Sequence, residues 1–222
     1  MYITDDVYDP RFGKTAPCPA GCNAEEGRRR LEKMSGLIGD QLRFRFDLPW
    51  RSGQQHAVAI LQGCLIQQPP AGFLLLTGSY GSGKTYMLCA AVNQARADGW
   101  SGVYLNAEQL LQHFRNAYDP KAENIGFDGL WQRVIEATVL CIDEVDRINP
   151  TPWAQAKMFQ LLDDRYEAAI YGGPRERRLT VLASNLRPRE MPEFLSSRLL
   201  DSESAVLDLW DVADMRQQRD DT

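Results

Sequence analysis

The chain has 222 residues, 44% of them hydrophobic, so it can bury one substantial core and is not disordered throughout. Its 30 acidic and 25 basic side chains give a net charge of −5, which argues against a protein that coats DNA through its overall field. No apolar run is long enough to span a membrane, the N-terminus lacks the layout of a secretion signal, and the five cysteines form no disulfide framework. We therefore expect a cytoplasmic protein without a membrane contact.

Residues 1–50 are expected to form a small N-terminal extension. They are rich in turn residues and include a basic stretch at 27–33. Cys18 and Cys22 stand close together with no His or further Cys nearby, whereas a tetrahedral zinc site needs four ligands. Either no zinc is bound, or a second chain or a carboxylate completes the site. Residues 51–222 would then form the main domain.

Strands and helices alternate through this main domain. Apolar residues at helical spacing predict helices, and short runs of apolar residues predict buried strands. The predicted order is helix 54–67, strand 73–76, helix 86–98, strand 103–105, helix from 106, helix 128–137, strand 139–142, helix 151–171, strand 179–183, short helix 192–200 and strand 205–209. The alternation indicates an α/β fold, with a parallel sheet of about five strands covered by helices on both faces. Ligands of such sheets lie beyond the carboxyl ends of the strands.

A glycine-rich turn joins the first predicted strand to the helix that follows it. It consists of Gly78, Ser79, Tyr80, Gly81, Ser82, Gly83, Lys84 and Thr85. The pattern G-x-x-x-x-G-K-[ST] between a strand and a helix is typical of a loop that cradles the phosphates of ATP. Lys84 would reach the β and γ phosphates, and the Thr85 hydroxyl would hold Mg²⁺. An incidental lysine in a glycine turn is the weaker interpretation.

Two carboxylates follow the third predicted strand. Asp143 and Glu144 end the buried run Val139 to Ile142, at the edge of the sheet where the glycine turn emerges. Asp143 would hold Mg²⁺ through its water shell, and Glu144 would accept a proton from the water that attacks the γ phosphate. Without the glycine turn, two solvated acids at a strand end would be the better interpretation.

Two residues further along the chain are candidates for the same chemistry. Asn185 follows the fourth predicted strand, where its amide could orient the attacking water, although asparagine is also a common turn former. Arg198 follows the predicted short helix and could act as an arginine finger on the nucleotide of a neighbouring subunit. An ordinary surface salt bridge is the alternative for Arg198.

With these four elements in order, the chain resembles the AAA+ ATPases, and within them the DnaC and IstB type of bacterial or phage helicase loaders and transposition helpers. The resemblance covers roughly residues 20–210. It implies a P-loop NTPase core in which the turn at 78–85 is Walker A, Cys141 to Glu144 is Walker B, Asn185 is sensor 1 and Arg198 is the arginine finger. The chain departs from larger AAA+ proteins in ending soon after the fifth strand, without a helical lid, and the role of Arg216 is unassigned.

The resemblance implies ATP hydrolysis with Mg²⁺ by a homo-oligomer that engages a replicative DNA helicase and single-stranded DNA, in a protein of phage or prophage origin. Arginines at 28–30, 175, 177 and 178 could contact the DNA, although solvated loop charges are the stronger interpretation. Three alternatives stay open: a transposition helper that binds duplex DNA and a transposase, a module that binds ATP with little hydrolysis, and a small-molecule kinase.

Overall fold

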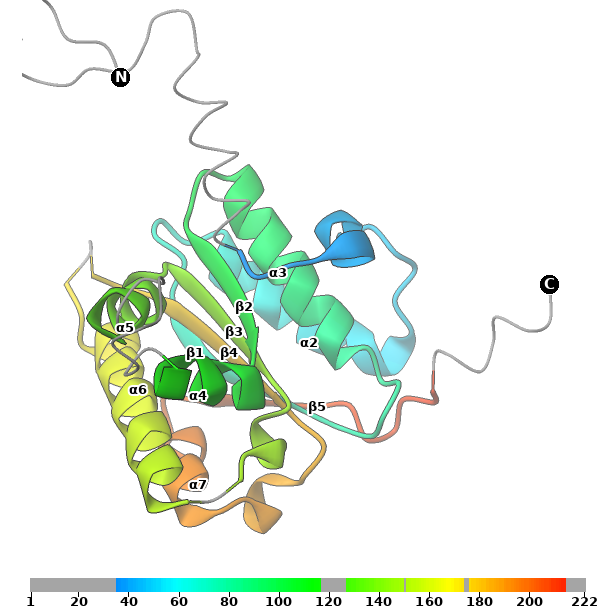
Figure 1. Ribbon diagram of the computed structural model, residues 1–222. Coiled ribbons are helices and arrows are strands. Elements are labelled where there is room, and N and C mark those ends of the chain that lie inside the picture. Colours follow the sequence, from blue (N-terminus) through cyan, green and yellow to red (C-terminus); the bar gives the residue numbers. More distant parts are fainter. Residues whose placement is uncertain (1–34, 117–126, 150, 174–175, 215–222) are drawn as a thin grey trace, which may run out of the picture.

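Five parallel strands form a single sheet in the computed structural model, which describes residues 35–116, 127–149, 151–173 and 176–214 (Figure 1). The strands are β1 (Gly72–Thr77), β2 (Gly102–Asn106), β3 (Val139–Asp143), β4 (Leu179–Ser184) and β5 (Ala205–Asp208). Their order across the sheet is β2-β3-β4-β1-β5. Because β4 is inserted between β1 and β3, residues that follow β4 lie between the glycine turn after β1 and the acids at the end of β3.

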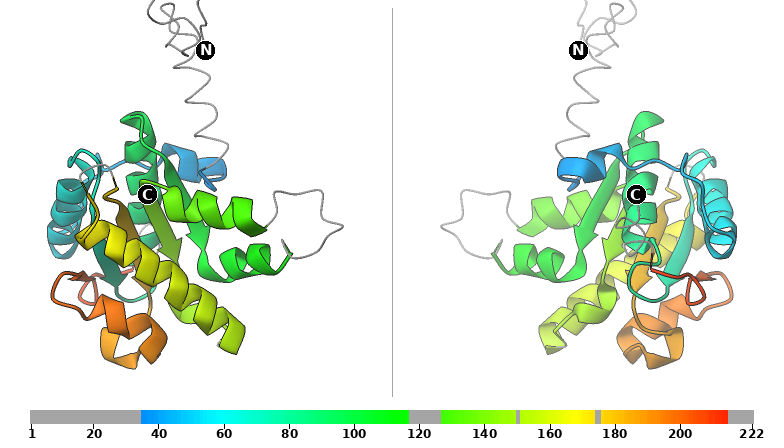
Figure 2. Two further views of the ribbon diagram at one scale, coloured as in Figure 1. Left: turned by 90° about the vertical axis from the view of Figure 1, so that its left-hand side faces the viewer. Right: turned by 90° about the vertical axis from the view of Figure 1, so that its right-hand side faces the viewer.

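Helices cover both faces of the sheet, as the two side views show (Figure 2). One face carries α2 (Ser52–Leu65) and α3 (Lys84–Ala97), and the other carries α4 (Ala107–Asn116), α5 (Phe127–Glu136), α6 (Pro152–Ile170) and α7 (Glu193–Leu199). Each face has its own apolar core. Leu74, Leu76 and Val181 point to the α3 side, while Leu75, Leu140 and Leu182 point to the α6 side. This alternation along each strand explains why the strands read as continuous hydrophobic runs.

The predicted alternation of strands and helices is therefore confirmed, and most boundaries agree within two residues. Thr151 caps α6 as its Pro152 suggested, because the Thr151 hydroxyl accepts a hydrogen bond from the Ala154 N–H. Arg198 lies in the last turn of α7, within the predicted bounds 192–200, and does not follow the helix.

Arg165 of α6 is completely buried at the amino-terminal edge of the sheet. Its guanidinium donates to the carbonyl oxygens of Val134, Ile135, Ala137 and Leu179, and to the Thr180 hydroxyl. Burial lowers the pKa of Arg165 to about 9, so the side chain is still charged at neutral pH. One side chain thus joins the end of α5, the link between α5 and β3, and the start of β4.

The last part of the predicted N-terminal extension packs on the same face as α3. Residues 35–50 include a 3-10 helix, η1 (Gly39–Arg43), and the Ser35 carbonyl accepts a hydrogen bond from the Tyr104 N–H. Asn93 of α3 donates to the Gln41 and Phe44 carbonyls. Cys18, Cys22 and the arginines at 28–30 lie outside the described residues, so zinc binding at the two cysteines is not tested. The domain division at residue 50 also stays a prediction.

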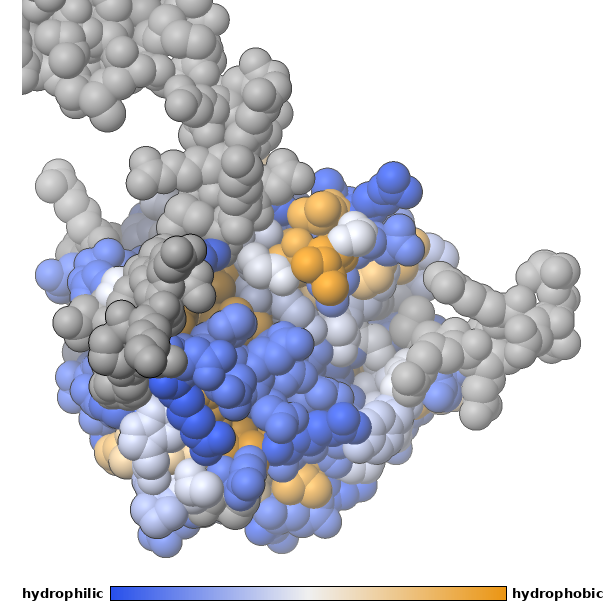
Figure 3. Space-filling model, viewed as in Figure 1, coloured by the Kyte–Doolittle hydropathy of each residue, from blue (hydrophilic) through white to orange (hydrophobic). Residues whose placement is uncertain are grey.

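The surface seen in the orientation of Figure 1 is mainly hydrophilic, with a hydrophobic area over η1, where Ile38 is 75% exposed (Figure 3). Within the described ranges, no helix combines the length and the apolar character that crossing a bilayer requires.

Candidate nucleotide site

The glycine turn has a backbone conformation that a ligand can approach closely. Gly81 and Gly83 have φ of +75° and +93°, a conformation that residues with a Cβ rarely adopt. Gly83 is also the N-cap of α3, so the positive end of that helix opens into the loop. Lys84 is 7% exposed, and its ammonium group donates to the Gly78 and Ser79 carbonyls at 2.7 and 2.8 Å and to the Ser82 hydroxyl. The lysine side chain therefore folds back over the loop. This is the loop in which Lys84 is predicted to bind the phosphates of the nucleotide.

Thr85 and Asp143 meet directly, although 58 positions separate them in the sequence. The Thr85 hydroxyl donates to Asp143 Oδ2 at 2.7 Å, and Asp143 Oδ1 accepts the Glu144 N–H at 2.9 Å. Asp143 is only 5% exposed, and burial raises the pKa of its carboxyl, an effect that these hydrogen bonds partly offset. The structure thus brings together the two side chains that the sequence predicted as magnesium ligands.

Glu144 has a φ of +52°, the one positive value at a non-glycine residue within the described ranges. Such backbone strain costs on the order of 1–3 kcal/mol and concentrates at functional sites. Its carboxylate accepts a hydrogen bond from Asn106 Nδ2 at 2.8 Å and pairs with the Arg147 guanidinium at 3.4 Å. Its side chain is 30% exposed, so water can reach the predicted base.

Asn185 lies between the glycine turn and the acid pair, since it follows β4. Its backbone N–H and its side-chain amide both donate to the Asp146 carboxylate, at 2.9 and 3.3 Å. Asp146 belongs to a short 3-10 turn, η2 (Val145–Arg147), directly after the acids. The predicted sensor is thus tied to the strand end that carries the predicted base.

Arg198 does not join this cluster within the subunit. It forms a tight ion pair with Asp163 of α6, with 2.6 Å between Arg198 Nε and Asp163 Oδ1, and it lies over the Tyr166 ring. About a third of the arginine side chain is exposed. The salt bridge that the sequence analysis held as an alternative is present, and a role on a neighbouring subunit requires Arg198 to leave Asp163.

Strand β2 supplies two polar contacts that the sequence analysis missed. Tyr104 donates to Asp143 Oδ2 at 3.1 Å, and Asn106 donates to Glu144. The signal was present as two polar side chains, two positions apart, at the end of a strand. It could be interpreted only once β2 was known to pair with β3.

Two further residues hold or face the glycine turn. Gln54 of α2 is fully buried and donates to the Ser82 carbonyl at 2.8 Å. Asp214 comes from the segment after β5, and a Cβ placed on Gly81 would lie 1.8 Å from its Oδ1. Val212 is buried in the same segment, and the Ala213 carbonyl accepts a hydrogen bond from Arg51. A carboxylate therefore rests against a loop that is suited to an anion.

The donor set fits ATP and Mg²⁺. Magnesium is usually held by one or two carboxylates together with substrate phosphates and waters, and here Thr85 and Asp143 offer one hydroxyl and one carboxylate beside the loop. Among the described residues no group of three or more His, Cys, Asp or Glu side chains could hold a metal ion without such a substrate. The residues of the loop would hold the phosphates, and the ion would neutralise their charge.

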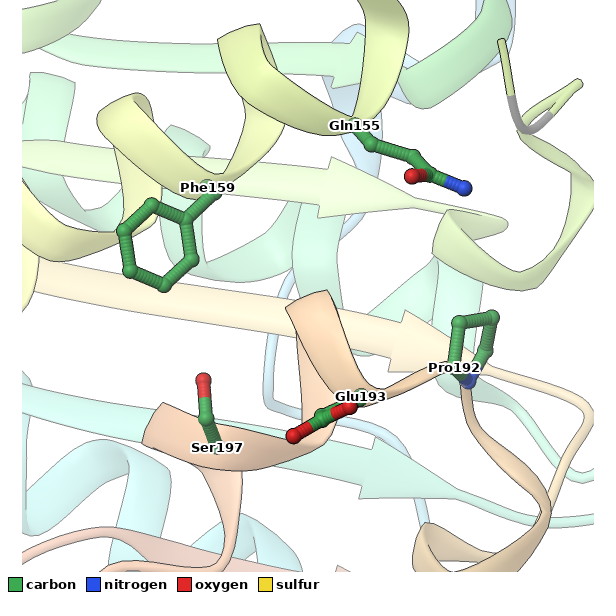
Figure 4. A pocket seen from close by; sticks show the side chains of 5 residues that line it. All are labelled: Gln155, Phe159, Pro192, Glu193 and Ser197. Atoms are coloured by element: carbon green, nitrogen blue, oxygen red, sulfur yellow. The ribbon is translucent and has the colours of Figure 1, made fainter. Parts of the chain in front are cut away.

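A separate hollow of about 430 Å³ lies between α6 and α7. Gln155 and Phe159 of α6 face Glu193 and Ser197 of α7 across it, with Pro192 at one end (Figure 4). It contains no residue of the glycine turn or of the acid pair, so we do not assign the nucleotide to it.

The predicted DNA-contacting arginines receive little support from the described residues. Arg178 donates to the Ile135 carbonyl and so serves the fold, whereas Arg177 is exposed. Arg175 lies outside the described residues, and contact with single-stranded DNA stays a prediction. Arg216, whose role was left unassigned, also lies outside them.

The strand order together with the loop, lysine, threonine and acid pair defines a P-loop nucleotide-binding protein of the AAA+ fold. The family described as "IstB-like ATP binding protein" matches residues 29–207, and the chain belongs to that family. The predicted resemblance to the DnaC and IstB type is confirmed.

Individual relatives agree with this assignment. The ATP-binding protein of insertion sequence IS1162 from Pseudomonas fluorescens is 33% identical over 92 residues, which are 41% of this chain and 38% of that protein. The DnaC helicase loader has a similar fold, with a TM-score of 0.61 and 16% identity over 77% of this chain and 99% of that one. AMPPCP-bound DnaA from Aquifex aeolicus also has a similar fold, with a TM-score of 0.63 and 19% identity over 75% of this chain and 50% of that one. The chain thus spans half or less of two of these relatives.

Proposed function

We propose that the protein is an ATPase that hydrolyses ATP with Mg²⁺ in an assembly of identical subunits. One observation carries the proposal: the phosphate loop with Lys84 and Thr85 meets Asp143 and the strained, water-accessible Glu144 at one edge of the sheet. Lys84 would bind the phosphates, and Thr85 and Asp143 would hold the ion that neutralises them. Glu144 would take the proton of the attacking water, and Asn185 would orient that water.

The exposure of Arg198 is compatible with the proposed assembly. This residue lies on α7 and is partly exposed, and within its own subunit it pairs with Asp163 and not with the glycine turn. In an assembly it would leave Asp163 and approach the phosphates of the neighbouring subunit. An arginine supplied in this way can accelerate hydrolysis by roughly 10³ to 10⁵.

Mixed-subunit assays test this arrangement. Arg198→Ala should leave ATP binding nearly intact and remove the rise in turnover that accompanies assembly. Mixing Arg198→Ala with Lys84→Ala subunits should restore part of the turnover, because each mutant then supplies the group that the other lacks. Absence of rescue in mixtures that do assemble would contradict a role for Arg198 on the neighbour.

For the biological task we propose a replicative helicase loader that contacts single-stranded DNA. The segment from Glu26 to Leu37 resembles the segment that joins the helicase-binding module of such loaders to their ATPase core. The fold shared with DnaC over almost the whole of that chain is compatible with this proposal. Capture of the host's replicative helicase by the purified protein, dependent on ATP, would support it.

The second candidate is a transposition helper that acts with a transposase on duplex DNA. It is favoured by the match to an ATP-binding protein of an insertion sequence. Fluorescence anisotropy with single-stranded and duplex oligonucleotides of the same sequence, with and without ATP, separates the two candidates. Preference for the duplex, together with failure to capture the helicase, would favour the helper.

A further inference from the structure

Strand β2 places one hydrogen-bond donor on each acid of the site. Tyr104 and Asn106 are two positions apart, so their side chains lie on the same face of the sheet. Asn106 is the register partner of Asp143 in the parallel pair β2–β3. As a result, Asn106 reaches Glu144, and the Tyr104 hydroxyl reaches Asp143 Oδ2.

The Asp143 carboxylate uses most of its acceptor capacity inside the protein. An ionised carboxylate offers about four acceptor sites on its two oxygens. Thr85 and Tyr104 donate to Oδ2, and the Glu144 N–H donates to Oδ1. About one site is left, which matches the single hydrogen bond that a water of the magnesium shell would need. The two fixed donors on Oδ2 and the one on Oδ1 also prevent the carboxylate from rotating.

We propose that Tyr104 is a positioning residue for magnesium, which acts by holding the Asp143 carboxylate in the orientation that receives the metal's water shell. The proposal rests on the proposed function, because it presupposes that Thr85 and Asp143 hold Mg²⁺. Thr85 cannot do this alone, since its hydroxyl must also coordinate the ion. Tyr104 touches neither the phosphates nor the metal in this arrangement.

Tyr104 is itself well fixed. Its backbone N–H donates to the Ser35 carbonyl at 2.7 Å, and its ring packs against the buried cluster on the α3 side of the sheet. An ionised carboxylate only accepts hydrogen bonds, so the Tyr104 hydroxyl is the donor in its contact with Asp143 Oδ2. A donor of this kind gives the carboxylate a constant orientation.

Tyr104→Phe removes only the hydroxyl and keeps the packed ring. Titration of Mg²⁺ into the full chain with a bound fluorescent ATP analogue should show the magnesium affinity reduced roughly 10- to 100-fold, the usual effect of losing a partner of a metal ligand. Affinity for the analogue in EDTA should equal that of the wild type, as should thermal unfolding without nucleotide. A merely structural role would change these two readouts and not the magnesium affinity alone.

Tyr166→Phe is the matched control, because the Tyr166 hydroxyl also bonds a carboxylate, that of Asp201, away from the acid pair. It should keep the wild-type magnesium affinity. In an Asp143→Asn background, Tyr104→Phe should cause no further loss, since the hydroxyl acts through Asp143.

Different results would contradict the role of Tyr104 and the proposed metal site. If the wild type binds the analogue more tightly with Mg²⁺ and Tyr104→Phe does so equally, Tyr104 has no positioning role. If Mg²⁺ does not alter binding to the wild type, the proposed metal site itself is wrong. An additive loss in the Asp143→Asn background would also overturn the proposal.

Discussion

The two edges of the sheet both bury charged side chains, but they use them differently. At the amino-terminal edge, Arg165 is surrounded by carbonyl oxygens that lie 14 to 31 positions away in the sequence. At the carboxyl-terminal edge, Lys84 donates to three oxygens of its own loop, which lie two to six positions away. The first pattern ties distant elements together, whereas the second keeps a cation beside a loop in which phosphates can replace its partners. In this protein the buried arginine therefore serves the fold, and the buried lysine is placed for binding.

Arg165→Met should have the largest effect and should act on stability. It leaves several buried carbonyls without a donor, each costing about 1–3 kcal/mol, so we expect the free energy of unfolding to fall by about 3–5 kcal/mol. Urea denaturation without nucleotide measures this loss. Arg177→Met replaces an exposed arginine between α6 and β4 and should change stability by less than about 0.5 kcal/mol. Equal stability of the two variants would show that Arg165 does not hold these segments together.

Glu144→Gln should act on turnover and not on stability. The amide keeps the shape of the side chain but cannot accept the proton, so we expect phosphate release to fall by roughly 10² to 10⁴ while ATP binding is retained. Glu108→Gln, an exposed glutamate at the start of α4, is the control and should turn over normally. Unaltered turnover in Glu144→Gln would instead support a module that binds ATP and scarcely hydrolyses it.

Asp214→Asn should have the smallest effect, in the opposite direction. Asp214 rests against Gly81, and two like charges about 4 Å apart repel by about 1 kcal/mol even in water. Removing its charge should tighten nucleotide binding roughly fivefold. Asp211→Asn removes the same charge from an exposed position in the same segment and should leave the affinity unchanged. If both variants bind alike, the Asp214 carboxylate does not oppose the phosphates.

Sequence reasoning predicted the strands, the helices and the residues of the loop and acid pair, because each rests on a local pattern. The buried runs ending at Thr77 and Asp143 mark strands, and the glycines mark the turn between strand and helix. The order of the strands was not predicted, since no local pattern states that β4 enters between β1 and β3.

Contacts between segments that are distant in the sequence could not be predicted either. Nothing near Arg198 in the sequence points to Asp163 of α6, and nothing near Gly81 points to Asp214. Tyr104 and Gln54 read as ordinary members of a strand and a helix until the fold places them beside Asp143 and Ser82. What sequence reasoning missed is therefore the set of side chains that position the predicted residues.

Calorimetric titration of ATP with Mg²⁺ into the wild type and into Lys84→Ala tests most directly whether the glycine turn and the acid pair form one nucleotide site. The account predicts binding by the wild type and no detectable binding by Lys84→Ala, with both proteins folded in the absence of nucleotide. An unchanged ATP affinity in Lys84→Ala would contradict it.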